Sequence, residues 1–192
     1  EARAVAMRIP GRNSDVRLWA DAAYDVLDRQ FATAAEKFAG VDPTNLISSR
    51  AAADLHVGYG RVLQRLGRHD QARAQFELGA DAILAEGQDA ARVRVAILAV
   101  IHAYLGDEDA ARRHLEESHA TRPDDQFYAV TTLFDHAVAE MLLGDHHAAV
   151  ATLAPLLERE YFMPLSKTDL RPEPLWDPLW EHPGGIGVLR DR

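Results

Sequence analysis

The chain has 192 residues, a formal net charge of −9, nine histidines and no cysteine. This length fits one domain or one short array of repeats, and a hydrophobic content of 47% excludes a disordered chain. The absence of cysteine excludes disulfides, thiolate nucleophiles, iron–sulfur clusters and cysteine-based zinc sites. The acidic balance argues against nonspecific binding to nucleic acid or to an anionic membrane, because both need a basic face.

The chain contains no segment that we expect to cross or enter a membrane. Its longest strongly apolar run, residues 95–105, is interrupted by His102 and is too short to span a bilayer. The first residues lack the basic end and the apolar stretch of a signal peptide, so we expect none. Because the chain starts at Glu1 rather than Met, we expect it to be a fragment of a longer protein.

The composition predicts an all-α fold. Ala and Leu are the commonest residues, both are strong helix formers, and the alternation typical of strands is nearly absent. In chain order, the predicted helices are 15–28, 31–39, 46–66, 70–85, 89–105, 107–121, 125–143 and 146–158. Six of the nine prolines lie between Pro155 and Pro183. We therefore predict a helical repeat domain over 1–160 and an extended Pro/Trp-rich closing segment over 161–192 that packs on it.

Three segments of the helical region repeat one pattern, and a fourth resembles them. Each has Leu-Gly, a polar stretch, an Ala five residues after the Gly and a large apolar residue four positions later. The glycines are Gly67, Gly106 and Gly144, the alanines Ala72, Ala111 and Ala149, and the large residues Phe76, Leu115 and Leu153. In the weaker copy Arg29 replaces the Gly, ahead of Ala34 and Phe38. These four anchors are 38, 39 and 38 residues apart.

This pattern predicts four antiparallel helical hairpins. A Gly ends the first helix of each hairpin because it tolerates the left-handed backbone conformation. The small Ala lets the two helices approach, and the large residue fills the seam between them. After the turns, Asp70, Asp107 and Asp145 lie where a carboxylate is expected to cap the second helix.

The hairpins resemble tetratricopeptide repeats. In that family a Gly or Ala lies seven residues before the turn Gly, as Gly60 and Ala99 do here, and a closing Pro often follows, as at Pro123. The period of 38–39 residues exceeds the family's 34 by about one helical turn. The resemblance implies a right-handed superhelix whose concave face is lined by the first helix of each hairpin.

Residues 170–183 are similar to the closing segment of bacterial multidomain regulators. The shared features are Leu-Arg, an acidic residue, Pro, an aromatic residue, Asp-Pro-Leu and a final Pro; the chain departs from the pattern at Gly184-Gly185. In such proteins a similar helical region follows a serine/threonine kinase, an adenylyl cyclase or a CadC-type winged-helix domain. The resemblance implies a non-catalytic regulatory module.

Counting back from the four anchors predicts the residues of a concave groove. The candidate partner-binding residues are Trp19, Val57, Arg61, Arg65, Val100, Phe134 and Met141. In one interpretation they bind a peptide, and the two arginines recognise charged groups of that peptide. In a second, the closing segment occupies the groove through Leu170, Leu175, Trp176 and Trp180. In a third, the register is shifted and the strip is ordinary interhelical core.

No pattern of residues predicts catalysis, a metal or a cofactor. His146 and His147 lie in a turn, and the spacing of His114 and His119 directs their rings apart on one helix. The acidic run 107–109 is explained by the helix dipole. The glycines at 184–187 lack the residues of a phosphate loop. The candidate catalytic, metal and cofactor sites are therefore none, and we do not expect an enzyme.

The sequence thus favours a protein-interaction or regulatory module of a larger bacterial signalling or transcription protein, with a protein or peptide as its partner. The alternative is a sensor of a small ligand or signal peptide. Its pocket would be closed by the closing segment and would lie near Trp19, Tyr104, Phe134 and Trp176. We expect no contact with nucleic acid or membrane. The oligomeric state is left open, and a homodimer is one alternative, since an uncapped terminal hairpin near Trp19 would allow it. The predicted location is the cytoplasm, with an extracytoplasmic sensor as the alternative.

Overall fold

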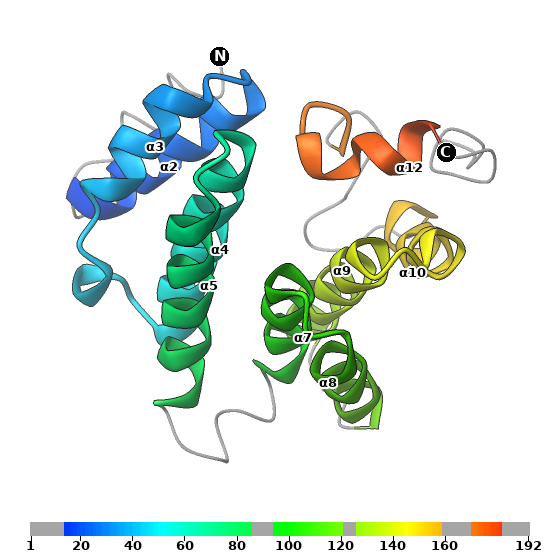
Figure 1. Ribbon diagram of the computed structural model, residues 1–192. Coiled ribbons are helices and arrows are strands. Elements are labelled where there is room, and N and C mark those ends of the chain that lie inside the picture. Colours follow the sequence, from blue (N-terminus) through cyan, green and yellow to red (C-terminus); the bar gives the residue numbers. More distant parts are fainter. Residues whose placement is uncertain (1–13, 86–93, 121–125, 159–169, 182–192) are drawn as a thin grey trace. The chain divides into compact units, whose positions relative to one another are not determined.

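The computed structural model describes residues 14–85, 94–120, 126–158 and 170–181. Every regular element in these ranges is a helix, and none of them is a strand, so the fold of the described residues is all-α (Figure 1). The chain forms two compact units, Glu1–Ala85 and Glu86–Arg192. The predicted boundary at residue 160, the superhelix and its handedness remain predictions, and each unit is described by itself.

Unit 1 consists of two helical hairpins and a short connecting turn. Its elements are α2 (Ser14–Leu27), α3 (Phe31–Ala39), the 3-10 helix η1 (Pro43–Asn45), α4 (Ser49–Arg65) and α5 (His69–Leu84). Within each hairpin the two helices pack on one another, and the packing of α3 on α4 joins the hairpins.

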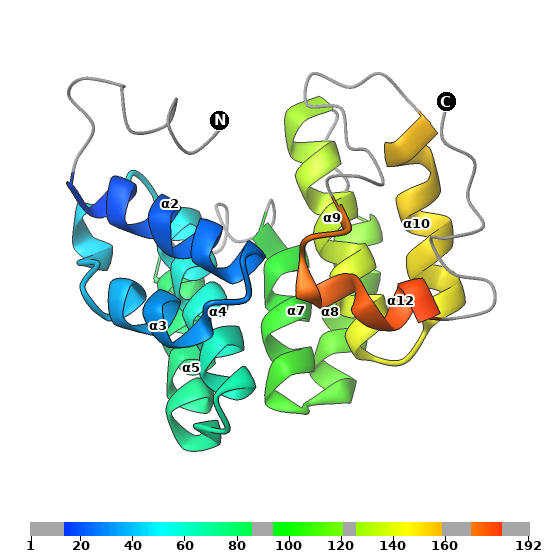
Figure 2. The same ribbon diagram turned by 90° about the horizontal axis from the view of Figure 1, so that it is seen from above.

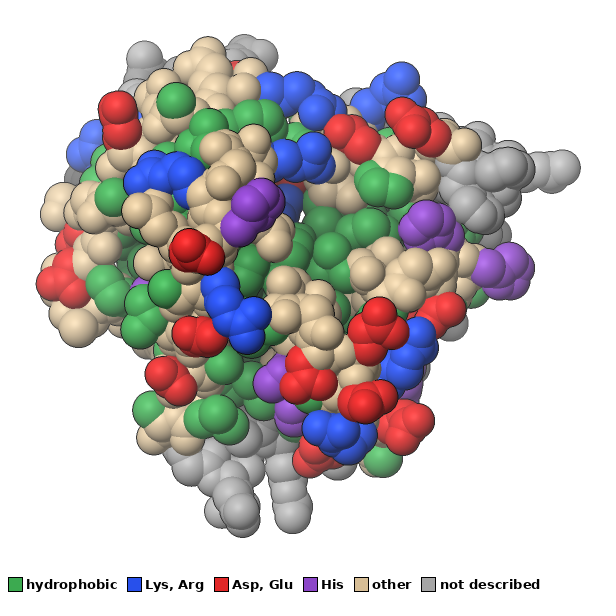
Figure 3. Space-filling view, viewed as in Figure 1, with side chains coloured by type: hydrophobic (Ala, Val, Ile, Leu, Met, Phe, Trp, Pro, Cys, Tyr) green, Lys and Arg blue, Asp and Glu red, His purple; other side chains and the backbone are tan. Residues whose placement is uncertain are grey.

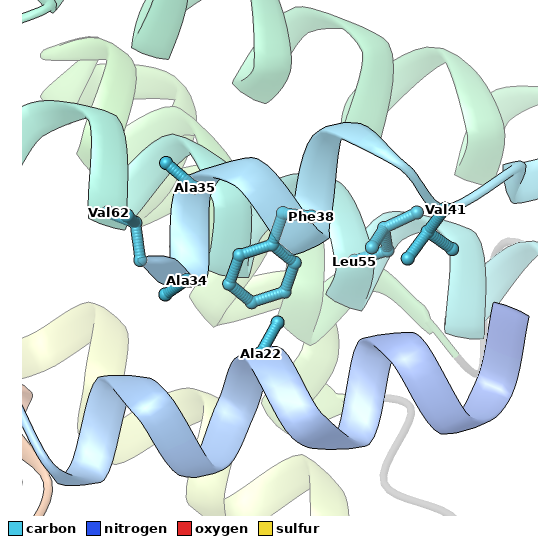
Figure 4. Packing of buried hydrophobic residues seen from close by; sticks show 7 residues of the cluster. All are labelled: Ala22, Ala34, Ala35, Phe38, Val41, Leu55 and Val62. Atoms are coloured by element: carbon cyan, nitrogen blue, oxygen red, sulfur yellow. The ribbon is translucent and has the colours of Figure 1, made fainter. Parts of the chain in front are cut away.

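The core of unit 1 lies where the two hairpins meet. Ala22 of α2 and Phe38 of α3 face one another, and Leu55 and Val62 of α4 contribute to the same cluster (Figure 4). The ring of Phe38 also stacks on the ring of Tyr59, with their centroids 5.9 Å apart. Large rings beside small alanines therefore fill the space between helices.

Unit 2 also contains two hairpins. Its elements are α7 (Val95–Leu105), α8 (Glu108–Ala120), α9 (Gln126–Leu142), α10 (His146–Glu158), the 3-10 helix η3 (Pro174–Trp176) and α12 (Asp177–Glu181). The pairs α7–α8 and α9–α10 form the hairpins, which pack on one another mainly through α7 and α9. The segment with η3 and α12 lies above α9 and α10 in Figure 1, and it passes in front of them when unit 2 is seen from above in Figure 2.

All four predicted turn anchors have a left-handed backbone, which confirms the repeat. The φ angles are 58° at Arg29, 73° at Gly67, 77° at Gly106 and 81° at Gly144. Arg29 is the only residue other than glycine with a positive φ among the residues that the structure describes. The weaker first copy therefore turns in the same way as the other three, although its side chain disfavours this conformation.

In the first two hairpins the residue seven before the anchor lies against the large residue nine after it, as Ala22 against Phe38 and Gly60 against Phe76. At the earlier position, Ala22, Ala99 and Ala137 are buried, and Gly60 is buried as well. An added Cβ on Gly60 would lie 2.5 Å from a ring atom of Phe76, so only glycine fits there without movement. The second hairpin thus combines the smallest residue with a large ring.

The predicted helix starts agree with the structure to within one residue except at two helices. The helix predicted from residue 89 is described as α7 from Val95, and residues 89–93 of that prediction lie outside the described residues. Helix α4 begins at Ser49 rather than at residue 46, because the Ser48 hydroxyl accepts a hydrogen bond from the Ala51 N–H at 3.1 Å and caps the helix. Asp107 caps α8 as predicted, by accepting a hydrogen bond from the Ala110 N–H at 3.0 Å. The prediction for Asp70 was wrong, since this residue lies within the first turn of α5 and does not cap it. There its negative charge interacts favourably with the positive end of the helix dipole.

The closing segment is not extended over the residues that the structure describes. Pro174 begins η3, and Pro178 lies at the second residue of α12. The φ angle of proline suits the first turn of a helix, where its missing N–H has no partner to lose. These prolines therefore start short helices instead of holding the chain straight.

Candidate partner-binding surfaces

The candidate groove residues of unit 1 divide into packed and accessible side chains. Trp19 is half-buried and packs against the core cluster between α2, α3 and α4. Val57 is buried in α4. Arg61 is half-buried and Arg65 is exposed. The two arginines, four residues apart on one face of α4, are thus the accessible part of the predicted set in this unit.

A further charged pair extends this face of α4 toward its N-terminus. The guanidinium of Arg50 lies 2.9 Å from the carboxylate of Asp54, one turn away. Burial raises the pKa of Asp54, although the charge of Arg50 acts in the opposite direction. Positions 50, 54, 61 and 65 follow one another at spacings of four, seven and four residues, so they share one face of the helix. This face carries three arginines and one aspartate.

The candidate groove residues of unit 2 are mostly packed. Val100 and Met141 are buried, so they contribute to the packing of α7 and α9. Phe134 and Tyr104 are half-buried. A role of the buried side chains in partner binding stays a prediction, and so does the pocket that the sensor hypothesis requires.

The closing segment places a buried tryptophan against α9. Trp176 has 0% of its surface exposed, and its ring meets that of Phe134 edge to face, with centroids 5.4 Å apart. Leu170, Leu175 and Leu179 are buried as well. The apolar side of this segment is therefore removed from water.

Contacts inside the closing segment hold its shape. The Leu175 N–H donates to the Glu173 carboxylate at 3.2 Å, which caps η3. The guanidinium carbon of Arg171 lies 5.0 Å from the ring centroid of Trp180, at cation–π distance. We refer to residues 170–181, with these contacts, as the tail.

The indole groups of the two tail tryptophans are poorly matched by polar groups of the described residues. The indole nitrogens of Trp176 and Trp180 are buried, and neither has a hydrogen-bond partner among the described residues. A buried donor without an acceptor costs about 1–3 kcal/mol relative to a satisfied one. The tail is therefore well buried in its apolar contacts but incompletely matched in its polar ones.

Two histidine pairs were not predicted from the sequence. Each pair joins one histidine of α8 to a histidine of another helix. The ring of His114 stacks on His102 of α7 at 5.1 Å, and the ring of His119 meets His136 of α9 at 4.2 Å. Burial and the neighbouring His102 lower the pKa of His114. Within the described residues, no group of three or more His, Asp or Glu is placed to hold a metal ion.

Charged side chains of both signs are interspersed over the face shown in Figure 3. None of the described helices is both long and apolar enough to cross a membrane. The exposed side chains of the described residues thus include charges of both signs, Arg65 of α4 and the large hydrophobic residues Ile47, Leu78 and Leu84.

A family model of the tetratricopeptide repeat matches residues 53–77 and 95–117. The chain contains a tetratricopeptide-repeat region. The two matches cover most of the α4–α5 and α7–α8 hairpins, including Gly60 with Gly67 and Ala99 with Gly106. Such repeats generally mediate interactions between proteins and are typically non-catalytic. No curated protein and no solved structure matches the chain significantly.

Proposed function

We propose that the chain is a non-catalytic interaction module of a larger bacterial regulator and that it binds a protein or peptide. The repeat region supports this role, since stacked hairpins present long side-chain surfaces without a catalytic pocket. The resemblance of residues 170–183 to the closing segment of multidomain regulators supports the regulatory context. A cytoplasmic location, the absence of nucleic-acid and membrane contacts, and a homodimer as one assembly are parts of the same proposal.

The accessible arginines of α4 are the observation that carries the choice of binding surface. Arg61 and Arg65 lie on one helix face within a matched repeat, and Arg65 is exposed. Guanidinium groups bind carboxylates with paired hydrogen bonds, and arginine is enriched among residues that dominate binding energy. The proposed ligand is therefore a peptide segment that carries acidic side chains.

Selection of random peptides displayed on phage, with the full chain as bait, tests this proposal. The affinity of each enriched peptide is then measured by fluorescence anisotropy with three proteins: the original chain, Arg65→Glu and Arg73→Glu. Arg73 is the matched control, because it is also an exposed arginine of the same hairpin but lies on α5. Loss of one hot-spot arginine is expected to weaken binding at least about tenfold.

Three outcomes decide between the possibilities. Enrichment of acidic peptides that lose affinity with Arg65→Glu but not with Arg73→Glu supports the proposal. Equal losses in both variants, or none, would exclude α4 as the binding surface. If no peptide is enriched, the interaction role itself is refuted for ligands of this kind.

A further inference from the structure

We propose that the tail is a tethered ligand of unit 2, which occupies the α9 surface at Phe134 and can be displaced by a segment of the same chemistry. That chemistry is a short, proline-rich turn that presents leucine and tryptophan on one side. The inference rests on the proposed binding role and adds its regulation: unit 2 is occupied by its own chain until a partner competes.

The first observation is how the tail is bound. It contacts α9 through the edge-to-face pair of Trp176 and Phe134, and its leucines 170, 175 and 179 are buried. Phe134 lies ten residues before the anchor Gly144, which is the position that Trp19 and Val57 occupy in unit 1. The tail therefore covers a position of the repeat that the sequence analysis assigned to partner binding.

The second observation is that the tail has a conformation of its own. Backbone N–H groups of Glu173 and Trp176 donate to the carbonyls of Leu170 and Glu173, at 3.2 and 3.1 Å. The cap by the Glu173 carboxylate and the contact of Arg171 with Trp180 lie in the same twelve residues. A segment with internal contacts of this kind loses less conformational freedom on docking than a segment without them, which favours its binding as a peptide ligand.

The third observation is the incomplete match of the tail to its site. The indole N–H groups of Trp176 and Trp180 are buried without an acceptor among the described residues. A competing segment that places a carbonyl or carboxylate near either group would gain a hydrogen bond that the tail leaves unmade. The tail holds its place through its tether, which raises its effective concentration to about the millimolar range.

The test uses the chain's own tail as the probe. A fluorescently labelled synthetic peptide of residues 168–183 is titrated with the full chain and with the full-chain variant Trp176→Ala, and binding is read by anisotropy. Loss of Trp176 is expected to free the site, so the variant should bind the peptide at least about tenfold more tightly than the original chain. Glu181→Ala is the matched control, because Glu181 is an exposed tail residue and its loss should change nothing. A peptide that itself carries Trp176→Ala should not bind.

A second measurement covers the case in which Trp176→Ala does not fold. A protease site is placed between residues 160 and 168 of the full chain, the chain is cut, and the pieces are diluted and separated by size. Release of the tail while the body keeps its helical circular dichroism supports a displaceable ligand. A body that unfolds when the tail leaves, or a tail that stays bound at all dilutions, would overturn the inference and make the tail a structural part of the fold.

Failure of this inference and failure of the proposed function are separable. The tail peptide probes unit 2 and needs no external partner, whereas the phage selection and Arg65→Glu probe unit 1. If peptides bind at Arg65 but the tail peptide binds no tighter to Trp176→Ala than to the original chain, only the inference is lost.

Discussion

Gly60→Ala tests the close contact between α4 and α5. A methyl group at this position would lie 2.5, 2.8 and 2.9 Å from three ring atoms of Phe76. Phe76 has only 1% of its surface exposed, so its ring has no open space to enter. Overpacking of this kind costs about 1–3 kcal/mol, whereas alanine is favoured over glycine within a helix by up to about 1 kcal/mol. All three distances are below 3.0 Å, which places the overpacking cost in the upper part of its range, so we expect a net loss of about 1–2 kcal/mol in the stability of unit 1.

Thermal and urea unfolding, followed by circular dichroism, measure this loss. For a unit of this size, 1 kcal/mol corresponds to a shift in Tm of about 4–8 °C. The matched control is Gly58→Ala, two residues away in α4, where the nearest ring atom of Phe38 would lie 3.3 Å from the new methyl group. This variant gains the same helix propensity with a milder contact, so its stability should stay near that of the original chain.

A second substitution separates the steric effect from other causes. The third and fourth hairpins pair alanine with leucine at the two equivalent positions. Phe76→Leu should therefore make room for the new methyl group, and Gly60→Ala should cost at least about 1 kcal/mol less in the Phe76→Leu background. The steric argument is refuted if Gly60→Ala costs the same in both backgrounds, or if it stabilises the chain as a simple gain in helix propensity would.

Three further variants test the turns and the histidines, each by the same unfolding measurements. Arg29→Gly should stabilise unit 1 by about 1 kcal/mol, because glycine adopts the left-handed φ of 58° without strain; a loss would mean that the contacts of the arginine side chain outweigh it. Gly106→Ala should destabilise unit 2 by about 1–2 kcal/mol through its φ of 77° alone, because the added methyl group would meet nothing within 4 Å; no loss would contradict this origin. His114 has a pKa below its ordinary value of 6.5, so the unfolded chain binds its proton more tightly. The stability that neutral His114 contributes is therefore present above pH 6.5 and is lost as the pH falls through the lowered pKa. In His114→Gln, the free energy of unfolding should fall less steeply over this pH range. If the dependence of the unfolding free energy on pH is unchanged, His114 is not its source.

The sequence predicted the hairpins well because their signals are local. A left-handed turn needs a residue that tolerates it, and the polar stretch and the small residue follow at fixed distances. Period and turn chemistry together therefore located the eight helices of the four hairpins, but not the short helix α12. Even the atypical anchor Arg29 was found through its spacing, and its φ of 58° confirms the assignment. The start of α4 was missed because Ser48, a cap, competed with apolar residues that extend the helical pattern toward residue 46.

Features that depend on contacts across the fold could not be predicted in the same way. Prolines in the tail were interpreted as extending it, yet Pro174 and Pro178 lie in the first turns of short helices, where the same fixed φ is favourable. The spacing of His114 and His119 showed that their rings diverge, but it contained no information on the histidines of α7 and α9 that meet them. Register from the anchors predicts the groove positions, whereas the burial of Val57 and Val100 depends on packing that the register does not contain.

The two units place different chemistry at equivalent positions of the same repeat, and this explains why the tail lies where it does. Six and two residues before the anchor, α4 carries Arg61 and Arg65, whereas α9 carries Val138 and Leu142. An arginine face is stable in water, but an apolar face around Phe134 is not, and it needs a cover. The tail supplies that cover with Trp176 and its leucines. In the proposed mechanism an acidic partner therefore binds the arginine face of unit 1, whereas access to unit 2 requires a segment that replaces the contacts of the tail.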